Sequence, residues 1–251
     1  MTTVLCDLDG VVYRGDTLIA GSDLALRRLV EAGAEVYFVT NNSTRNPGHV
    51  VEKIRRLTGV RFPEDRVFTS PQAGVAMLEP DDGPCLVVGE EGIRDALGES
   101  GFAITEDPNA ARTVMVGLDR QVDYRRIADA ADAVRRGARF IATNDDPTYP
   151  TSDGLEPGAG SMVAAIAVAA GRPAEVAGKP HPPMRRLIRS RGIDRAWVIG
   201  DRLDTDIALA VEEEGWLSIL VLTGVTLQPS DAADLVAADL GEAVDLVLAG
   251  P

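Results

Sequence analysis

Cysteine, histidine and aromatic residues are scarce in this 251-residue chain. Its two cysteines, Cys6 and Cys85, form neither a CxxC pair nor a disulfide framework, which argues against a disulfide-stapled scaffold. Its two histidines, His49 and His181, have no metal-ligand partners at a suitable spacing. Because only 4% of the residues are aromatic, Val, Leu, Ile and Ala must build the core. We expect both cysteines to be small buried hydrophobic residues.

Long apolar runs and an excess of positive charge are also absent. No stretch of about 18 apolar residues occurs, and the N-terminus has no basic segment followed by an apolar one. We therefore expect no transmembrane span and a cytoplasmic location. The formal net charge of −14 disfavours nucleic acid or an anionic membrane as a partner, because both require a basic surface.

Short apolar runs alternate with amphipathic segments along most of the chain. This alternation predicts an α/β fold with a parallel sheet and helices on both of its faces. The predicted strands are residues 3–9, 34–40, 66–70, 85–89, 112–118, 139–144, 195–200 and 217–224, and the predicted helices are residues 22–32, 49–59, 71–78, 91–101, 124–137, 161–171, 181–192 and 204–215.

Pro-, Gly- and acid-rich stretches at 79–84 and 171–178 suggest domain boundaries. They predict a discontinuous core of residues 1–81 and 177–251, interrupted by an inserted domain of residues 82–176. Within the insertion, residues 145–160 are rich in turn formers and are expected to form a long loop.

Polar residues follow four of the predicted strands, in the stretches DLDG, TNNS, GDRLDTD and LTG. Functional residues of parallel sheets gather at the carboxyl ends of the strands. Asp7, Asp9 and Asp201 would then lie at one edge of the sheet. Single aspartates there are usually turn or cap residues, but three together form a good site for a hard cation such as Mg²⁺, which prefers oxygen ligands.

Two further stretches suit an anion. Thr40 to Ser43 offer hydroxyls, amides and backbone N–H groups at a strand end, although a polar turn explains the same residues equally well. Lys179 lies between Gly178 and Pro180, which restrict the local backbone. A solvated loop lysine is the simpler interpretation, and the alternative is a cation that neutralises carboxylates or binds phosphate.

Taken in order, DLDGV, TNN, GKP and GDRLDTD resemble the four motifs of the haloacid dehalogenase-like superfamily, and the resemblance covers essentially the whole chain. The long gap between TNNS and GKP resembles the subfamily with a large α/β cap inserted there, which contains NagD-like and phosphoglycolate or 4-nitrophenyl phosphatases. ATNDDPTYPTSDGLEPGAGS is similar to the end of that cap. The resemblance implies a Rossmann-like core for the parallel sheet and a cap that covers the site.

The resemblance also implies a role for each matching residue. Asp7 would be the nucleophile that takes the phosphoryl group as an aspartyl-phosphate. Asp9 would be the general acid for the leaving oxygen and then the base for water. Asp7, the backbone carbonyl of Asp9 and Asp201 would hold Mg²⁺, and Lys179 would orient Asp7 and offset charge.

The remaining predicted residues surround these. Thr40, Asn41 and Asn42 would bind the phosphoryl oxygens, with Ser43 as a supporting residue. Asp206 would support the metal-bound waters or Lys179. Tyr149 is the aromatic residue of a small and polar loop, so it would either contact substrate or pack between cap and core.

These residues predict a Mg²⁺-dependent phosphatase of small phosphorylated metabolites, such as phosphoglycolate, glycerol phosphate, a sugar phosphate, a nucleotide or 4-nitrophenyl phosphate. Asp9 favours phosphatase over dehalogenase, which does not need a second carboxylate. A phosphomutase or phosphotransferase on the same core, a phospho-receiver and a non-catalytic binding protein are the alternatives. A homodimer through the cap is compatible with the resemblance.

Overall fold

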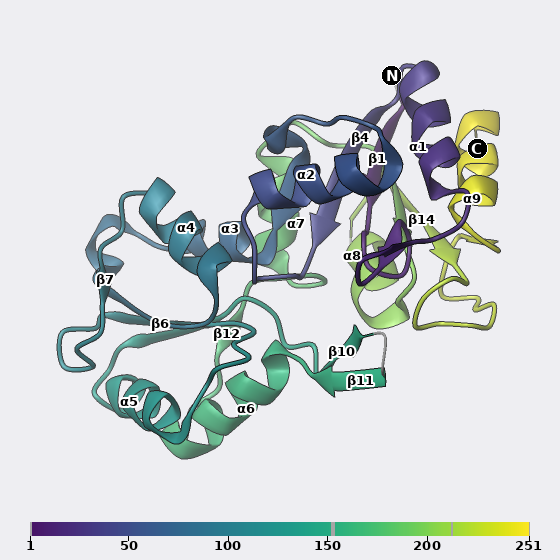
Figure 1. The fold of residues 1–251 in the computed structure, drawn as a ribbon. Helices are drawn as coiled ribbons and strands as arrows, with labels where there is room; N and C mark the ends of the chain where they lie inside the picture. Colours follow the sequence, from purple (N-terminus) through teal and green to yellow (C-terminus); the bar gives the residue numbers. More distant parts are fainter. Residues whose placement is uncertain (1, 152–153, 212, 251) are drawn as a thin grey trace. The chain divides into compact units, whose positions relative to one another are not determined.

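The structure is a computed structural model that describes residues 2–151, 154–211 and 213–250 (Figure 1). The chain forms two compact units, each built from segments that are far apart in the sequence. The first unit comprises Met1–Thr40, Pro47–Phe68 and Ile188–Pro251, and the second comprises Asn41–Asn46 and Thr69–Leu187.

The sheet of the first unit has the strand order β15-β14-β13-β1-β4-β5, and the strands from β15 to β4 pair in parallel. Non-consecutive neighbours of this kind require crossover connections, which the helices provide. The strands are β1 (Thr3–Cys6), β4 (Glu35–Thr40), β5 (Val67–Thr69), β13 (Ala196–Gly200), β14 (Trp216–Val221) and β15 (Leu235–Ala237), and a short hairpin of β2 (Tyr13–Arg14) and β3 (Thr17–Leu18) follows β1.

Helices α1 (Ser22–Glu31), α2 (Pro47–Thr58) and α9 (Leu240–Ala249) contribute buried side chains to one apolar cluster with β1, β4, β13 and β14. Helices α1 and α9 lie side by side (Figure 1). Leu5, Val198 and Leu220 are buried as well, but they alternate with the strand residues of that cluster and so face the opposite side. Both faces of this parallel sheet are therefore covered, as parallel sheets require.

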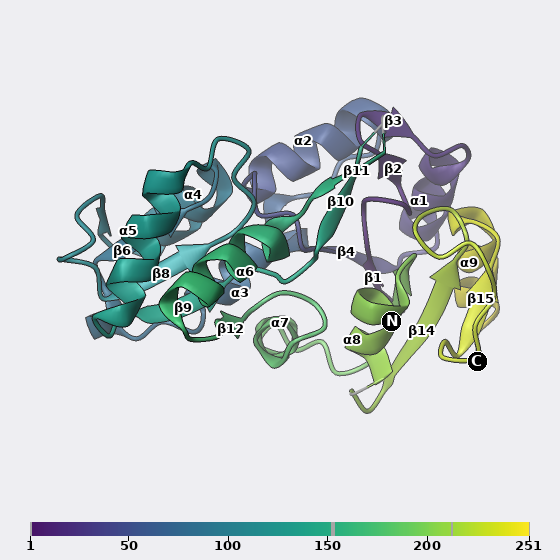
Figure 2. The same cartoon turned by 90° about the horizontal axis from the view of Figure 1, so that it is seen from below.

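The second unit has its own five-stranded sheet with the order β12-β9-β8-β6-β7, paired in parallel throughout. Helices α5 and α6 pack on each other and share an apolar cluster with β6, β8 and β9 (Figure 2). The elements of this unit are β6 (Cys85–Val88), β7 (Ile104–Thr105), β8 (Thr113–Val116), β9 (Arg139–Ala142), β12 (Glu175–Val176), α3 (Ser70–Val75), α4 (Glu91–Glu99), α5 (Tyr124–Arg135), α6 (Ala159–Ala170) and the 3₁₀ turn η2 (Pro80–Asp82). Helix α7 (Pro182–Arg189) begins in this unit and ends in the first, which also contains the 3₁₀ turn η1 (Glu64–Arg66).

The predicted α/β fold with parallel sheets is confirmed. The expected loop at 145–160 is wrong in part, because it contains the antiparallel strands β10 (Thr148–Thr151) and β11 (Gly154–Pro157). The expected helix at 204–215 is also wrong in part. Among its described residues, it begins with the π-helical turn η3 (Leu203–Ile207) and continues as the short α-helix α8 (Ala208–Val211).

The boundaries proposed at 81/82 and 176/177 remain a prediction. Within the residues that the structure describes, no helix is both long enough and apolar enough to traverse a bilayer. Cys6 and Cys85 are fully buried, as expected. Burial raises the pKa of Cys85 to about 11, so its thiol stays protonated at neutral pH and is a poor nucleophile.

Candidate active site

Asp7 and Asp201 leave neighbouring strands at the same edge of the first sheet. Strands β1 and β13 pair with Cys6 opposite Ile199, and the Asp7 N–H continues the ladder by donating to the Ile199 carbonyl at 2.9 Å. Asp201 directly follows β13. Parallel strands in this register bring their carboxyl ends together, so the two carboxylates come from adjacent strand ends.

Asp206 reaches the same edge through the π-helical turn η3. Its N–H donates to the Arg202 carbonyl at 3.1 Å, and its Oδ2 accepts the Arg202 N–H at 3.2 Å. The approach to the strand is very close, because a Cβ on Gly200 would lie 2.1 Å from the Asp206 Cβ. A glycine at the end of β13 is thus what admits Asp206. Wide π-helical turns are frequent at functional sites.

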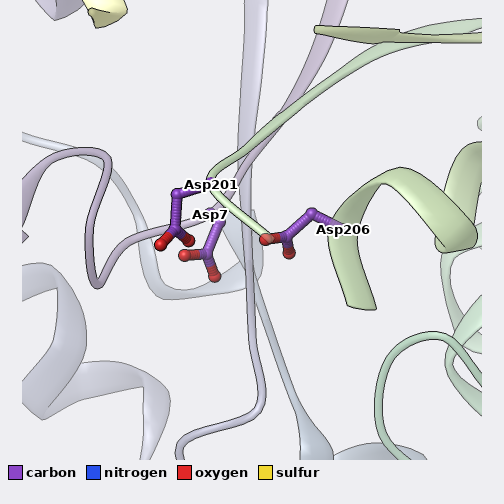
Figure 3. Close-up of side chains that lie close together, drawn as sticks. All are labelled: Asp7, Asp201 and Asp206. Atoms are coloured by element: carbon purple, nitrogen blue, oxygen red, sulfur yellow. The ribbon is translucent and has the colours of Figure 1, made fainter. Parts of the chain in front are cut away.

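The carboxylates of Asp7, Asp201 and Asp206 form one cluster (Figure 3). One oxygen from each lies within 4.8 Å of the others, and the three residues are 9%, 1% and 1% exposed. Two unit charges about 4.8 Å apart repel by roughly 3 kcal/mol at an effective dielectric constant of about 20. The cluster is therefore costly by itself. Its all-oxygen donor set suits a hard divalent cation, which would remove that cost.

This cluster differs in one member from the predicted metal set. Asp206, which we predicted only as a supporting residue, supplies its carboxylate directly. Asp9 was predicted to contribute its backbone carbonyl, and that role stays a prediction. Asp9 is partly buried and begins a tight turn, in which the Gly10 N–H donates to the Tyr13 carbonyl at 2.8 Å.

The pKa of Tyr13 reflects the negative charge beside this turn. Burial raises the pKa of its phenol well above the ordinary value, and the charges of Asp9 and Asp7 raise it further. The Lys53 ammonium lies 3.9 Å from the centroid of the Tyr13 ring. Tyr13 therefore stays neutral at physiological pH, and its ring holds a cation close to the Asp9 turn.

In the second unit, the Asn41 carboxamide is bonded to the Lys179 main chain. Its Oδ1 accepts the Lys179 N–H at 2.8 Å, and its Nδ2 donates to the Lys179 carbonyl at 3.1 Å and to Asp146 Oδ2 at 3.1 Å. Lys179 is 3% exposed, so it is not a solvated loop lysine. A Cβ on Gly178 would lie 2.5 Å from Asn41 Oδ1, which explains a glycine before the lysine. Asn41 thus positions the Lys179 loop.

The main-chain carbonyl of Asn41 is held as well. It accepts hydrogen bonds from Asn144 Nδ2 at 2.7 Å and from Ser70 Oγ at 2.8 Å. Neither Asn144 nor Asp146 was predicted from the sequence. The signal was present, because TNDD directly follows strand β9 and the similar stretch TNNS begins at the last residue of β4. A second polar strand end of the same type could have identified both residues.

The other residues of the TNNS stretch are largely buried in the structure. Thr40 is 3% exposed and ends β4. Asn42 Oδ1 accepts from the N–H and the hydroxyl of Thr44, which closes a local turn. Ser43 is 1% exposed, and its hydroxyl accepts the Leu118 N–H at 3.0 Å. These contacts stabilise the stretch, and the predicted binding of phosphoryl oxygens stays a prediction.

Tyr149 lies on strand β10 and packs against a cation of the same unit. The Arg120 guanidinium is 5.5 Å from the centroid of the Tyr149 ring and is itself paired with Glu90 at 2.9 Å. Tyr149 is partly buried. Its hairpin is thereby anchored to the second unit, and a contact between Tyr149 and substrate stays a prediction.

The position of Asn41 gives a first testable prediction. We expect Asn41→Ala to lower the free energy of unfolding by about 1–3 kcal/mol, because it removes both hydrogen bonds between the Asn41 side chain and the main chain of the buried Lys179. Urea denaturation measures the effect. Asn109→Ala is the matched control, since its side chain donates a hydrogen bond to Asp107 within an exposed turn. Equal losses in the two variants would contradict the positioning role.

Two family models match the sequence. A haloacid dehalogenase-like hydrolase family matches residues 4–103, and a HAD-hydrolase-like family matches residues 176–243. The 5′-nucleotidase YutF of Bacillus subtilis is 37% identical over 88% of this chain and 87% of its own length. The chain belongs to the haloacid dehalogenase-like hydrolases.

Solved structures of this family agree with that assignment. The p-nitrophenyl phosphatase from Archaeoglobus fulgidus superposes with a TM-score of 0.88 at 31% identity, covering 97% of this chain and 98% of its own. The glycerol phosphate phosphatase of Mycobacterium tuberculosis in complex with magnesium has a TM-score of 0.85 at 34% identity, covering 95% and 74%. With such relatives, this haloacid dehalogenase-like chain is a phosphoric monoester hydrolase, and the predicted NagD-like resemblance is confirmed.

Proposed function

We propose that this enzyme is a Mg²⁺-dependent phosphatase that hydrolyses small phosphate monoesters through an aspartyl-phosphate on Asp7. The observation that carries the proposal is the cluster of three buried carboxylates from Asp7, Asp201 and Asp206. Buried carboxylates at this separation need a cation, and oxygen ligands without sulfur or imidazole suit Mg²⁺. The magnesium complex of the mycobacterial glycerol phosphate phosphatase supports the same metal.

Two chemical steps are proposed. An Asp7 carboxylate oxygen attacks phosphorus while the bond to the leaving oxygen breaks, and Asp9 donates a proton to that oxygen. Asp9 then takes a proton from water, whose oxygen attacks the phosphorus. The bond to Asp7 breaks, which releases inorganic phosphate and restores the Asp7 carboxylate. Bound Mg²⁺ would offset the negative charge on the phosphoryl oxygens.

Other residues act by positioning or by charge in this proposal. Asp201 and Asp206 hold the metal, and Thr40 and Asn42 bind phosphoryl oxygens. Lys179 supplies a buried positive charge. Asn41 acts through its bonds to the Lys179 main chain, so it supports the reaction without donating to the substrate. Phosphoryl transfer depends mainly on such positioning and electrostatic stabilisation.

The proposed substrates are small monoesters. Relatives named a 5′-nucleotidase, a p-nitrophenyl phosphatase and a glycerol phosphate phosphatase support this class. We propose that Tyr149 on the β10–β11 hairpin contributes to the choice among them, because it is the aromatic residue of this strand pair and Arg120 holds its ring.

A substrate panel with metal removal tests the proposal. We expect phosphate release from at least one of 4-nitrophenyl phosphate, glycerol phosphate, phosphoglycolate, a sugar phosphate and a nucleoside monophosphate when Mg²⁺ is present. EDTA should abolish the release, and excess Mg²⁺ should restore it, because the three carboxylates repel one another without a cation. Activity that survives exhaustive chelation would contradict the metal requirement, and inactivity on the whole panel would contradict the phosphatase.

A further inference from the structure

The turn that follows strand β14 encloses the Asp201 carboxylate within the first unit. The Val225 N–H donates to Asp201 Oδ2 at 2.5 Å, and the Thr226 N–H donates to the Asp201 carbonyl at 3.1 Å. One turn therefore holds both the side chain and the main chain of the same aspartate. A main-chain donor fixes the plane of a carboxylate more firmly than a flexible side chain does, because it has no rotamers of its own.

Two glycines leave the space that this carboxylate fills. A Cβ on Gly224 would lie 1.8 Å from Asp201 Oδ2, and a Cβ on Gly10 would lie 2.5 Å from the same atom. Both distances are far below any real contact of a Cβ atom. Gly10 also has a φ of +91°, a backbone conformation that favours glycine whatever the space. Gly224 has no such φ, so its close approach to Asp201 is the reason for glycine there.

The turn is tied to the loop that follows Asp7 and Asp9. The Thr223 hydroxyl donates to the Gly10 carbonyl at 2.6 Å, and Arg14 donates to the Thr223 carbonyl at 2.6 Å. The turns after β1 and β14 thus form one hydrogen-bonded frame on either side of Asp201. The Thr223–Gly10 and Arg14–Thr223 hydrogen bonds do not involve the side chains of Asp7 or Asp9, to which the chemical steps are assigned.

We propose that Thr223, Gly224 and the Val225 N–H are positioning groups, which hold the Asp201 carboxylate in the orientation that ligates the divalent cation. This inference rests on the proposed function for the identity of the cation. Groups that orient a metal ligand typically change metal affinity or activity by about 10–100-fold when they are altered. A preset carboxylate also avoids the rotamer entropy that a mobile ligand loses on binding the metal.

Gly224→Ala tests the steric part of this frame, and Gly98→Ala is its matched control. Gly98 lies in α4, where a Cβ would meet nothing within 4 Å. We expect Gly224→Ala to weaken Mg²⁺ binding in isothermal titration about tenfold or more, and Gly98→Ala to leave it unchanged. Higher Mg²⁺ should restore kcat of Gly224→Ala with 4-nitrophenyl phosphate, which a general folding defect would not permit. A folded Gly224→Ala protein with wild-type Mg²⁺ affinity overturns the inference.

If Gly224→Ala does not fold, two smaller changes at Thr223 test the same positioning role. Thr223→Val removes the hydroxyl that bonds to the Gly10 carbonyl, whereas Thr223→Ser keeps it. We expect weaker Mg²⁺ binding for the valine variant and recovery in the serine variant. Equal affinities in both overturn the inference.

Wild-type protein separates this inference from the proposed function. If it binds Mg²⁺ but hydrolyses no phosphate ester, the proposed function fails and the frame around Asp201 is still tested by titration. If it hydrolyses esters without binding any divalent cation, the positioning inference is overturned while the phosphatase stands.

Discussion

Asp7→Asn is expected to reduce phosphate release by about three orders of magnitude or more, since it replaces the carboxylate that we propose as the nucleophile with a neutral amide. The Asp7 N–H remains in the ladder with Ile199, and the side chain keeps its size, so the fold should survive. The phosphoenzyme should disappear with the activity. Acid-quenched protein from a brief reaction with labelled substrate measures that intermediate directly.

The same substitution has a second expected effect, of opposite sign. Without metal, the three carboxylates repel one another, so removing one charge should raise the melting temperature of the metal-free protein. Asp231→Asn, at an exposed position, is the control and should change it little. A lower melting temperature for Asp7→Asn, or retained activity, would contradict the roles proposed for this residue.

Asp9→Asn is expected to lower turnover by about 10²–10⁴-fold, because both proton transfers are assigned to its carboxyl group. The loss should depend on the leaving group. 4-Nitrophenolate leaves without protonation, so the first step should proceed and the aspartyl-phosphate should accumulate as a burst. An alkyl ester such as glycerol phosphate needs the proton, so its first step should be slow and leave little intermediate.

Rapid-quench measurements on both substrates separate these steps. Asp9→Glu keeps the acid but moves it by one methylene, so a partial recovery of turnover with the alkyl ester supports the assignment. An equal loss on the two esters with no trapped phosphoprotein would instead indicate that Asp9 only shapes the turn at Gly10. Full activity would refute the acid–base role. Transfer of the phosphoryl group to an added alcohol instead of water would favour a phosphotransferase.

The sequence predicted which residues lie at the carboxyl ends of the strands, because that prediction needs only short stretches of sequence. Each strand is a short apolar run, and the polar residues come directly after it, so adjacent parallel strands bring Asp7 and Asp201 together. The place of Asp206 within the carboxylate cluster was not predicted, for a physical reason. Its segment has the composition of an α-helix. The close packing against Gly200 and the hydrogen bond from the Arg202 N–H favour the wider turn, and both depend on contacts that composition does not reveal.

Contacts made between distant segments account for the remaining differences. The interpretation of Asn41 as an anion-binding amide stays a prediction. Its side-chain partners in the structure are 105 and 138 residues away, and no sequence pattern links them. Strands β10 and β11 together contain two prolines, one glycine and one glutamate. These residue types are depleted in strands, so the sequence resembles a loop unless the pairing of the two strands is known. The last strand and helix, β15 and α9, lie beyond the predicted elements because their short apolar runs follow a long polar turn.

The division of the chain also limits how its parts can be exchanged with those of relatives. The chain passes between the two units four times, and the short piece Asn41–Asn46 belongs to the second unit although it precedes α2. A chimera that grafts only residues 82–176 would keep Asn41 from one parent and take Asn144 and Asp146 from the other. Such a graft preserves the Lys179 loop only if both parents carry the same residues at these positions. The unit of modular exchange is therefore the whole second unit, Thr69–Leu187 together with the six residues that follow β4.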